Sequence, residues 1–569
     1  MAFSQHPLLA QAQAWLAQDP DPETRAELQG IIDGGDSAEL EARFGARLGF
    51  GTAGLRGELG AGPNRMNRVL VAQAAAGIAA WLNGNSAAAV DARGQHPSVV
   101  IGYDGRVNSR VFAEDSAVIF AGAGFSVLLF DGFVPTPMLA FAVKRGGYSL
   151  GVMVTASHNP PRDNGYKVYL GGANGGSQII SPVDSEMAAA IDVVAAAQTF
   201  GEISKSTEFQ VGGQELRAAY IERAVDLVGV QDSAVVADWP KTVFTAMHGV
   251  GWKPVSAVFA AAGLPLPELV TEQIEPDGNF PTVDFPNPEE PGAMDLAFAK
   301  ASQVGAELIL ACDPDADRLA VAVPDTSIDV GWRKLTGDQI GLVLGNWTAE
   351  RLAAAARTGS GQAGASRSGT LACSIVSSSA LGAVAAAHGL PFEQTLTGFK
   401  WISKVPNLAF GFEEALGYCL DPQHTPDKDG VTAALVVATI VAKLKAQGSS
   451  LEQHLHELGQ RYGHFATGQV SLRFASVETA KTMVQALREN PPASIDGSQA
   501  AFADLAAGWN GLKPTDGLLF NLADGRRVII RPSGTEPKLK CYLQAVGESE
   551  LAAAAGLASL NAAVSLLLK

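Results

Sequence analysis

Short apolar segments alternate with helix-forming segments along most of this chain, and no other feature restricts its fold more. The apolar runs are rich in Val, Ile and Leu and predict buried strands. They occupy residues 98–104, 126–130, 149–155, 242–245, 306–311 and 370–376. Helical segments stand among them, at residues 69–82, 112–124, 136–143 and 214–228. Strands that alternate with helices predict an α/β fold with parallel or mixed sheets.

The chain has 569 residues. That is too long for one hydrophobic core, so we expect about four domains. Residues 1–210, 211–330 and 331–450 each combine strands and helices and predict three mixed α/β layer domains. Residues 451–569 differ, because a charged helix (451–462), a strand pair around Arg527 to Ile530 and a terminal helix (551–568) predict an α+β domain. Ligands in open α/β sheets bind beyond the carboxyl ends of strands, so we expect one central cleft.

Composition excludes several classes of protein. The net charge of −17 argues against nucleic acid as a partner, because a phosphate backbone needs a basic face. Four cysteines without CxxC spacing indicate a reduced, cytoplasmic protein with no zinc site. The N-terminus lacks the apolar region of a signal peptide, and no apolar run predicts a membrane span. The stretch from Leu551 to Leu568 comes closest and is expected to be a packed terminal helix.

Three carboxylates at alternate positions follow the apolar strand 306–311: Asp313, Asp315 and Asp317. Like charges this close repel unless a cation lies between them, and hard oxygen ligands suit Mg²⁺. A solvated acidic turn is the alternative interpretation. An EF-hand is excluded, because the loop lacks the required Gly and Pro324 stands at position twelve. The Asp-x-Asp motif of aspartyl-phosphate hydrolases competes, although Asp317 and Arg318 depart from it.

Strand 149–155 leads into Thr155-Ala156-Ser157-His158-Asn159-Pro160, which predicts a turn with Ser157 on its exposed tip. A hydroxyl there can act as a nucleophile or carry a phosphate. Ser and His also occur together in loops where their side chains only form hydrogen bonds that stabilise the turn. This pair alone therefore does not establish a catalytic role.

Two further loops carry polar side chains. Arg531-Pro532-Ser533-Gly534-Thr535 offers hydroxyls, backbone donors and an Arg, a combination that can cradle an anion, although an ordinary polar turn has the same composition. Around Glu413, acidic residues next to aromatics suit sugar hydroxyls, and a capping segment is the alternative.

Taken in order along the chain, these four loops resemble the α-D-phosphohexomutase family. The resemblance extends to Gly51-Thr52-Ala53-Gly54-Leu55-Arg56-Gly57, to Asn164-Gly165-Tyr166-Lys167 and to the segment from Asp277 to Glu289. The longer forms Thr397-Gly398-Phe399-Lys400-Trp401 and Phe412-Glu413-Glu414-Ala415-Leu416-Gly417-Tyr418 look most like the branch of phosphoglucomutases and phosphopentomutases.

The resemblance implies an isomerase that moves a phosphoryl group between two hydroxyls of one sugar through phosphorylated Ser157 and a sugar 1,6-bisphosphate. It implies a Mg²⁺ site formed by Ser157 with its phosphate, Asp313, Asp315 and Asp317. Arg56, His158, Lys167 and Arg318 would act in catalysis, with Lys167 as acid or base if a cation-rich cleft lowers its pKa, or else as a phosphate contact. The residues implied in substrate binding are Thr397, Gly398, Glu413, Ala415, Lys428, Arg531, Ser533, Gly534 and Thr535.

The expected reaction interconverts glucose 1-phosphate and glucose 6-phosphate in a cytoplasmic monomer or homodimer. Ala415 stands where many family members have Ser, which loosens hexose recognition and keeps a phosphopentose open. Phe399 stands where phosphomannomutases often have His, so mannose is also open. A sugar-bisphosphate synthase and a non-catalytic sugar-phosphate sensor are the competing functions, and the intact Ser157 and Asp residues disfavour the sensor.

Overall fold

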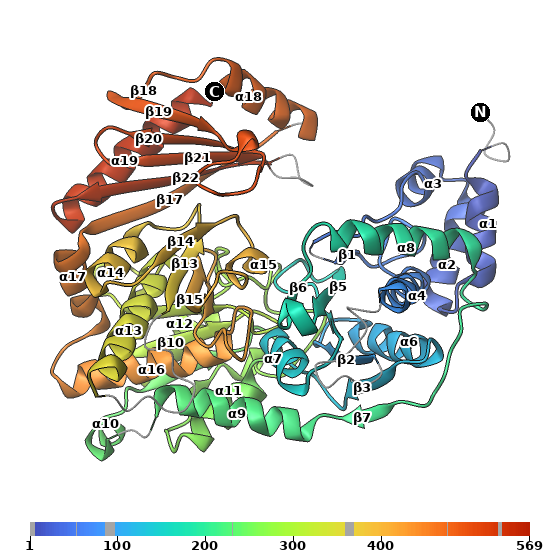
Figure 1. Cartoon of the computed structure of the whole chain (residues 1–569), viewed down its shortest axis with the longest axis horizontal. Coiled ribbons are helices and arrows are strands. Elements are labelled where there is room, and N and C mark those ends of the chain that lie inside the picture. The colour runs from blue at the N-terminus through green and yellow to red at the C-terminus, as the bar shows by residue number, and fades with distance from the viewer. Residues whose placement is uncertain are drawn as a thin grey trace. The chain divides into compact units, whose positions relative to one another are not determined.

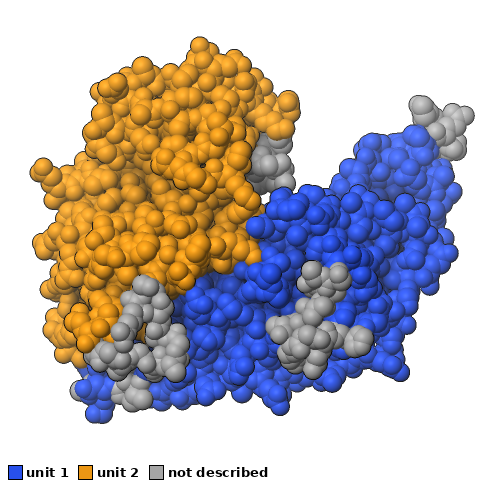
Figure 2. Space-filling model, in the orientation of Figure 1, with its two compact units in different colours: residues 1–334, 417–443 blue, residues 335–416, 444–569 orange. Residues whose placement is uncertain are grey.

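The computed structural model describes residues 6–52, 54–85, 97–229, 232–358, 369–474, 476–532 and 538–568. The chain forms two compact units, which Figure 2 distinguishes by colour. Unit 1 comprises Met1–Lys334 and Gly417–Lys443, and unit 2 comprises Leu335–Leu416 and Leu444–Lys569. The chain therefore leaves unit 1, returns to it for a short segment and leaves it again.

Three helices open unit 1: α1 (Leu9–Gln18), α2 (Pro22–Gly34) and α3 (Ser37–Phe44). The side chains of Asp21 and Asp36 accept hydrogen bonds from the first backbone N–H groups of α2 and α3. Such caps satisfy donors that a helix start leaves without partners.

The first sheet of unit 1 has the strand order β1-β5-β4-β2-β3-β7, with β6 paired to β5. Its strands are β1 (Leu55–Glu58), β2 (Ser98–Tyr103), β3 (Ser126–Phe130), β4 (Leu150–Val154), β5 (Asp163–Leu170), β6 (Ser177–Gln178) and β7 (Gln210–Gly212). The helices α4 (Arg68–Gly84), α6 (Ser109–Gly122), α7 (Thr136–Gly146) and α8 (Val183–Ala197) accompany it, with a short 3-10 turn at Gly172–Asn174.

Strands β2 and β4 are buried along their whole length and pair in parallel. Continuous apolar sequence is what a strand buried on both faces requires. Parallel neighbours end at the same edge of a sheet, so Asp104 after β2 and Thr155 after β4 begin adjacent loops. The Asp104 N–H donates to the carbonyl of Val154, which ties the two loops at their start.

The second sheet of unit 1 has the order β12-β11-β10-β8-β9. Its strands are β8 (Thr242–Thr245), β9 (Glu268–Leu269), β10 (Leu308–Cys312), β11 (Leu319–Pro324) and β12 (Trp332–Lys334). The helical elements are α9 (Gln214–Val228), α10 (Ser233–Ala237), α11 (Trp252–Ala261), α12 (Asp295–Val304) and a 3-10 turn at Thr271–Gln273. Strands β10 and β11 are antiparallel, so the acidic residues 313–317 form the turn between them.

Unit 2 begins with α13 (Gly337–Thr358) and holds three parallel strands, β13 (Thr370–Ser374), β14 (Phe392–Thr395) and β15 (Leu408–Glu413). The helices α14 (Ala380–His388), α15 (Phe399–Ile402) and α17 (Leu451–Tyr462) complete this layer. After β15 the chain enters unit 1 through β16 (Gly417–Cys419), and most of α16 (Gly430–Ala446) lies there.

The last sheet is antiparallel in every described pairing, with the order β17-β22-β21-β20-β19-β18 (Figure 1). Its strands are β17 (His464–Arg473), β18 (Ser494–Ile495), β19 (Ser498–Asp504), β20 (Leu518–Leu522), β21 (Arg527–Pro532) and β22 (Lys538–Gly547). The helices α18 (Val477–Glu489) and α19 (Glu550–Leu567) pack on it, and a 3-10 turn lies at Leu505–Ala507. The different C-terminal architecture predicted from the sequence is confirmed.

Helix α19 is long and apolar enough to cross a membrane, which no other single helix among the described residues is. This differs from the expectation that no segment reaches that length. Its buried residues Leu560 and Val564 pack in the hydrophobic core of the last sheet, as a terminal helix of a folded domain would.

The predicted α/β architecture is confirmed, and the strand and helix positions agree with the sequence patterns to within a few residues. The boundaries 1–210, 211–330, 331–450 and 451–569 and the expected central cleft stay predictions. The segment Gly417–Lys443, placed by those boundaries in the third domain, packs within unit 1.

Candidate active site

Ser157 lies in the loop after β4 and is only 3% exposed, so the expected exposed tip is wrong. A local hydrogen bond holds the loop backbone: the Ser157 N–H donates to Thr155 Oγ1 at 2.8 Å. Ser157 adopts a left-handed backbone conformation with φ of 51°. Residues other than glycine rarely adopt it, and such strain gathers at functional sites.

Arg106 fixes this loop from the neighbouring one. Its guanidinium donates hydrogen bonds at 2.6 to 2.9 Å to four backbone carbonyls, those of Ser157, Asn159, Pro160 and Asp163. The same group lies 4.9 Å from the ring centre of Phe280. Sequence reasoning did not identify Arg106 as a functional residue, and its place shortly after a buried strand is the one signal that could have pointed to it.

The acidic turn gathers its three carboxylates in the protein interior. One carboxylate oxygen from each of Asp313, Asp315 and Asp317 lies within 4.8 Å of the others, and all three residues are buried. Asp315 Oδ1 and Asp317 Oδ1 have no hydrogen-bond partner among the described residues. Buried oxygens of this kind call for a cation, and an all-oxygen set suits Mg²⁺. The residues present therefore fit the implied metal.

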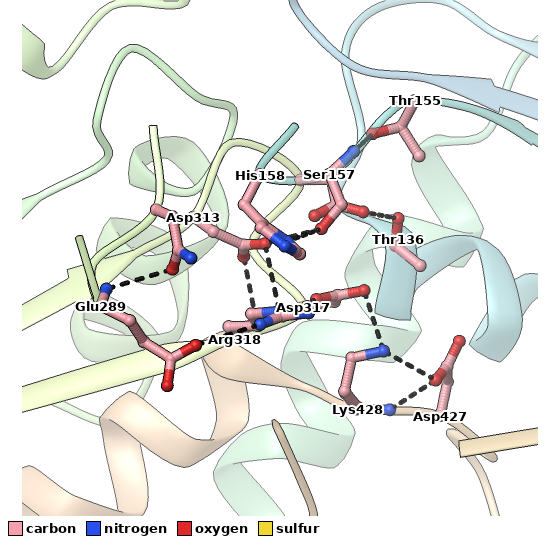
Figure 3. Close-up of polar contacts among 12 residues, drawn as sticks. Thr136, Thr155, Ser157, His158, Glu289, Asp313, Asp317, Arg318, Asp427 and Lys428 are labelled. Atoms are coloured by element: carbon pink, nitrogen blue, oxygen red, sulfur yellow. Dashed lines mark hydrogen bonds and ion pairs between the residues drawn. The ribbon is translucent and has the colours of Figure 1, made fainter. Parts of the chain in front are cut away.

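The Ser157 hydroxyl lies beside this acidic cluster (Figure 3). Ser157 Oγ donates to Asp313 Oδ2 at 2.9 Å and lies 3.2 Å from His158 Nδ1. Burial, together with the charges of Asp315 and Asp317, raises the pKa of Asp313 well above its usual range. A serine oxygen so placed can share a metal with the carboxylates once it carries phosphate.

Lys167, on β5, neutralises the other two carboxylates. Its Nζ lies 2.7 Å from Asp315 Oδ2 and 3.0 Å from Asp317 Oδ2. Burial lowers the pKa of Lys167, but the two carboxylates outweigh burial and raise it above its ordinary value. The lowered pKa set as the condition for acid-base action is therefore not found in this arrangement. Acid-base action by Lys167 stays a prediction.

Other cations surround the cluster. Arg318 Nε lies 3.8 Å from both Asp313 Oδ2 and Asp317 Oδ1, and Lys428 Nζ lies 3.2 Å from Asp317 Oδ2. Burial raises the pKa of Asp317, but Lys167, Lys428 and Arg318 outweigh it and hold that pKa far below its usual range. An ionised carboxylate ringed by cations can exchange one of them for a metal ion.

Two predicted residues contact the serine loop itself. Arg56, on β1, donates to Asn159 Oδ1 at 3.0 Å. Burial lowers the pKa of His158 well below its ordinary value, and the nearby Arg318 and Arg56 lower it further, so the imidazole is neutral. Unit 1 thus brings together all the residues predicted for catalysis and for the metal, with Lys428 beside them.

Unit 2 holds most of the residues predicted to bind substrate. Gly398 N–H donates to Glu413 Oε1 at 2.7 Å, and Arg531 donates to the hydroxyl of Thr397. Ala415 follows β15 in the same loop as Glu413. Ser533, Gly534 and Thr535 lie outside the described residues. Thr397 and Gly398 therefore link two loops within one unit: the predicted sugar loop (residues 413–415), through Glu413, and the predicted phosphate loop (residues 531–535), through Arg531.

Comparison with known proteins places these loops in a family. Models of the phosphoglucomutase/phosphomannomutase family match the chain in order: α/β/α domain I at residues 47–197, domain II at 218–326, domain III at 336–462 and the C-terminal domain at 483–556. The chain belongs to this family, the α-D-phosphohexomutases, and is a phosphomutase by that membership.

Relatives support the assignment over nearly the whole length. A Haemophilus influenzae protein named "Probable phosphomannomutase" is 48% identical over 85% of this chain and 93% of its own. Mouse phosphopentomutase is 35% identical over 93% of this chain and 89% of its own. The crystal structure of Paramecium pp63/parafusin, a phosphoglucomutase, shares the fold with a TM-score of 0.67 at 18% identity, covering 92% of this chain and 95% of that one.

Proposed function

We propose that this protein interconverts the 1- and 6-phosphates of a hexose, with glucose as the expected sugar, and carries the phosphoryl group on Ser157. The observation that supports this most is the buried contact of Ser157 Oγ with Asp313, 2.9 Å away, inside a cluster of three carboxylates and Lys167. A hydrolase must admit a water molecule to attack the phosphate. Ser157 is buried next to a candidate metal site, which suits a residue that carries a phosphate instead.

In the first half-reaction, the bond between phosphorus and Ser157 Oγ breaks and a bond to the free sugar hydroxyl forms. The hydroxyl loses a proton and Ser157 Oγ gains one, so no proton is released overall. Lys167 starts charged, so we assign it first as the acid toward the departing serine oxygen and then as the base toward the hydroxyl. The second half-reaction returns the other phosphate of the sugar bisphosphate to Ser157.

Phosphoryl transfer depends on positioning and charge neutralisation. Mg²⁺ held by Asp313, Asp315 and Asp317 would supply part of that neutralisation. Arg318 and Arg56 add fixed positive charge near the transferring group, and neutral His158 contributes a hydrogen bond to the serine oxygen. Each of these assignments uses a side chain that lies in the cluster around Ser157.

Substrate recognition is assigned to the sugar loop and the phosphate loop. Glu413 would accept hydrogen bonds from sugar hydroxyls. Thr397 and Gly398, next to Glu413, are assigned to bind the same sugar. Arg531, with Ser533, Gly534 and Thr535, would hold the phosphate that does not react, and Lys428 is also assigned to substrate binding. Binding energy from that distant phosphate orients the sugar.

A phosphopentose is the second candidate substrate. Ala415 offers no hydroxyl to a hexose, and mouse phosphopentomutase is similar along almost the whole chain. Mannose phosphate is a further candidate on the strength of the Haemophilus influenzae relative. We expect a cytoplasmic monomer or homodimer without nucleic acid or membrane partners.

The test is a substrate comparison. Purified protein is assayed with glucose 1-phosphate, mannose 1-phosphate and ribose 1-phosphate in the presence of Mg²⁺ and catalytic bisphosphate. We expect the highest kcat/KM for glucose 1-phosphate and no turnover by Ser157→Ala. A higher kcat/KM for ribose or mannose phosphate would overturn the choice of sugar. Stoichiometric release of bisphosphate would indicate a synthase instead.

A further inference from the structure

A buried carboxyl group that the proposed mechanism does not use lies next to Glu413. Glu414 Oε2 accepts hydrogen bonds from the hydroxyls of Ser377, at 2.8 Å, and Ser374, at 3.1 Å. The backbone N–H of Glu414 donates back to Ser377 Oγ at 3.0 Å. Glu414 is thus bonded through both its side chain and its backbone to the turn that follows β13.

That turn is also held by the last sheet. Arg527, on β21, donates to the carbonyl of Ser377 at 2.6 Å. Gln544, on β22, accepts from the Ser379 N–H at 2.8 Å and donates to the Ser379 hydroxyl at 2.8 Å. Strand β21 ends at Pro532 and carries Arg531. A continuous chain of hydrogen bonds therefore joins the sugar loop to the strand of the phosphate-binding Arg.

Acidic groups crowd this junction. Glu413 on β15, Asp338 on α13, Cys373 on β13 and Arg527 on β21 are the titratable or charged groups that interact with one another or with Glu414 there. Burial raises the pKa of Glu414 to about 7, and the charges of Glu413 and Asp338 contribute to the rise. Glu414 is therefore uncharged below neutral pH and gains a repelled negative charge above it.

We propose that Glu414 is a positioning residue: it bonds the sugar loop to the turn at Ser374–Ser377, and the negative charge that it gains on losing its proton is repelled by Glu413 and Asp338 and displaces both the sugar loop and the Arg531 strand. This inference rests on the proposed function, because it concerns how tightly that site binds a sugar phosphate. It assigns control of substrate affinity by pH to a residue outside the set that we assign to substrate binding.

Stability and substrate affinity should both fall as pH rises, because folding raises the pKa of Glu414. The unfolded chain releases the Glu414 proton near the ordinary value of 4.5, whereas the folded chain keeps it to about 7. The folded state thus loses stability as pH rises from about 4.5 to about 7. Affinity for a sugar phosphate falls at higher pH, when the carboxylate forms inside the folded protein.

Glu414→Gln tests the idea, because glutamine has the shape of the uncharged acid and cannot ionise. KM for glucose 1-phosphate is measured from pH 6 to 8.5 in both proteins, with Glu393→Gln, an exposed carboxylate on β14, as the control. We expect KM of the wild type and of the control to rise about tenfold more than KM of Glu414→Gln, while kcat follows one profile in all three. Ser377→Ala, which removes a hydroxyl that lowers the pKa of Glu414, moves the midpoint to higher pH.

A second readout does not depend on activity. The melting temperature of the wild type should fall relative to that of Glu414→Gln between pH 5 and 7.5. An active wild type whose KM and melting profiles match those of Glu414→Gln would overturn the role of Glu414 and leave the proposed function intact. An inactive wild type would overturn the proposed function, and the melting comparison would then decide whether Glu414 holds its proton. If Glu414→Gln does not fold, Ser377→Ala decides, and an unmoved midpoint would count against the proposal.

Discussion

Arg106 is not assigned to bind substrate, but its hydrogen bonds determine the position of Ser157. Its guanidinium is buried and bonded to four carbonyls of the serine loop, a geometry that the ammonium of lysine cannot reproduce. A shift of about 1 Å in a reacting group can cost about 100-fold in rate.

We therefore predict that Arg106→Lys lowers kcat by about 100-fold with little change in KM. Arg110→Lys is the matched control, because Arg110 is exposed and pairs only with Glu114 among its described ion pairs. Steady-state kinetics checks this, together with a circular dichroism spectrum to show that the variant folds. Equal kcat in the two variants would contradict the role of Arg106 in positioning Ser157.

Gly54, directly before β1, lies close against the backbone of β5. A Cβ at Gly54 would lie 1.8 Å from the carbonyl oxygen of Tyr166, and the residue has φ of 76°. We predict that Gly54→Ala destabilises unit 1 by about 3 kcal/mol. Gly30→Ala, in an open position of α2, should instead stabilise by up to about 1 kcal/mol. Thermal unfolding of both variants measures the difference, and similar melting temperatures would contradict it.

At the scale of elements, the hairpin β10–β11 explains why a metal site in the acidic loop could be predicted from the sequence. A buried apolar strand followed by three carboxylates leaves few alternatives to a cation site. The Ser157 loop was located correctly by its strand, but its burial was not, because the covering groups come from distant segments: Arg106 after β2 and Asp313 after β10. Local patterns do not report contacts between residues so far apart in the chain.

Contacts between distant segments also explain why the sequence does not reveal the raised pKa of Lys167. Sequence places it ten residues after Ser157 without showing that Asp315 and Asp317 are its nearest partners. Charge surroundings assembled from two sheets set its pKa, and no pattern along one strand records them.

Mg²⁺ should stabilise the acidic turn, since it relieves repulsion among buried carboxylates. At a concentration one hundred times its Kd, the ion should add about 2.7 kcal/mol to the free energy of unfolding of unit 1. We predict that chelation abolishes both this stabilisation and activity, and that Asp315→Asn weakens Mg²⁺ binding measured by calorimetry. Asp284→Asn, an exposed carboxylate, is the control. Unchanged affinity in Asp315→Asn would argue against the site.

At the scale of the whole molecule, the two units divide the assigned work: unit 1 holds the serine, the acidic cluster and the cations around it, and unit 2 holds the sugar loop and Arg531. Sequence predicted the succession of four α/β and α+β segments. It did not predict that Gly417–Lys443 packs in unit 1. Tyr169 and Tyr220, which donate hydrogen bonds to Asp427 and Asp429 there, lie 258 and 209 residues earlier in the chain.

This division predicts a pattern of hydrogen exchange. Mg²⁺ alone should slow exchange at residues 155–160 and 313–318 in unit 1 and leave β20 in unit 2 unchanged. Added glucose 1-phosphate should then slow exchange at residues 397–398 and 413–415 in unit 2. Protection of unit 2 by Mg²⁺ alone would show that the assignment of residues to the two tasks is wrong.

The central claim is that Ser157 carries the phosphoryl group, and intact-protein mass spectrometry tests it directly. After incubation with Mg²⁺ and glucose 1,6-bisphosphate, the wild type should gain the mass of one phosphoryl group, which peptide mapping assigns to Ser157 and which excess glucose 1-phosphate removes. Ser157→Ala should gain nothing. A phosphoryl group on another residue, or full turnover by a wild type that never becomes phosphorylated, would contradict the account.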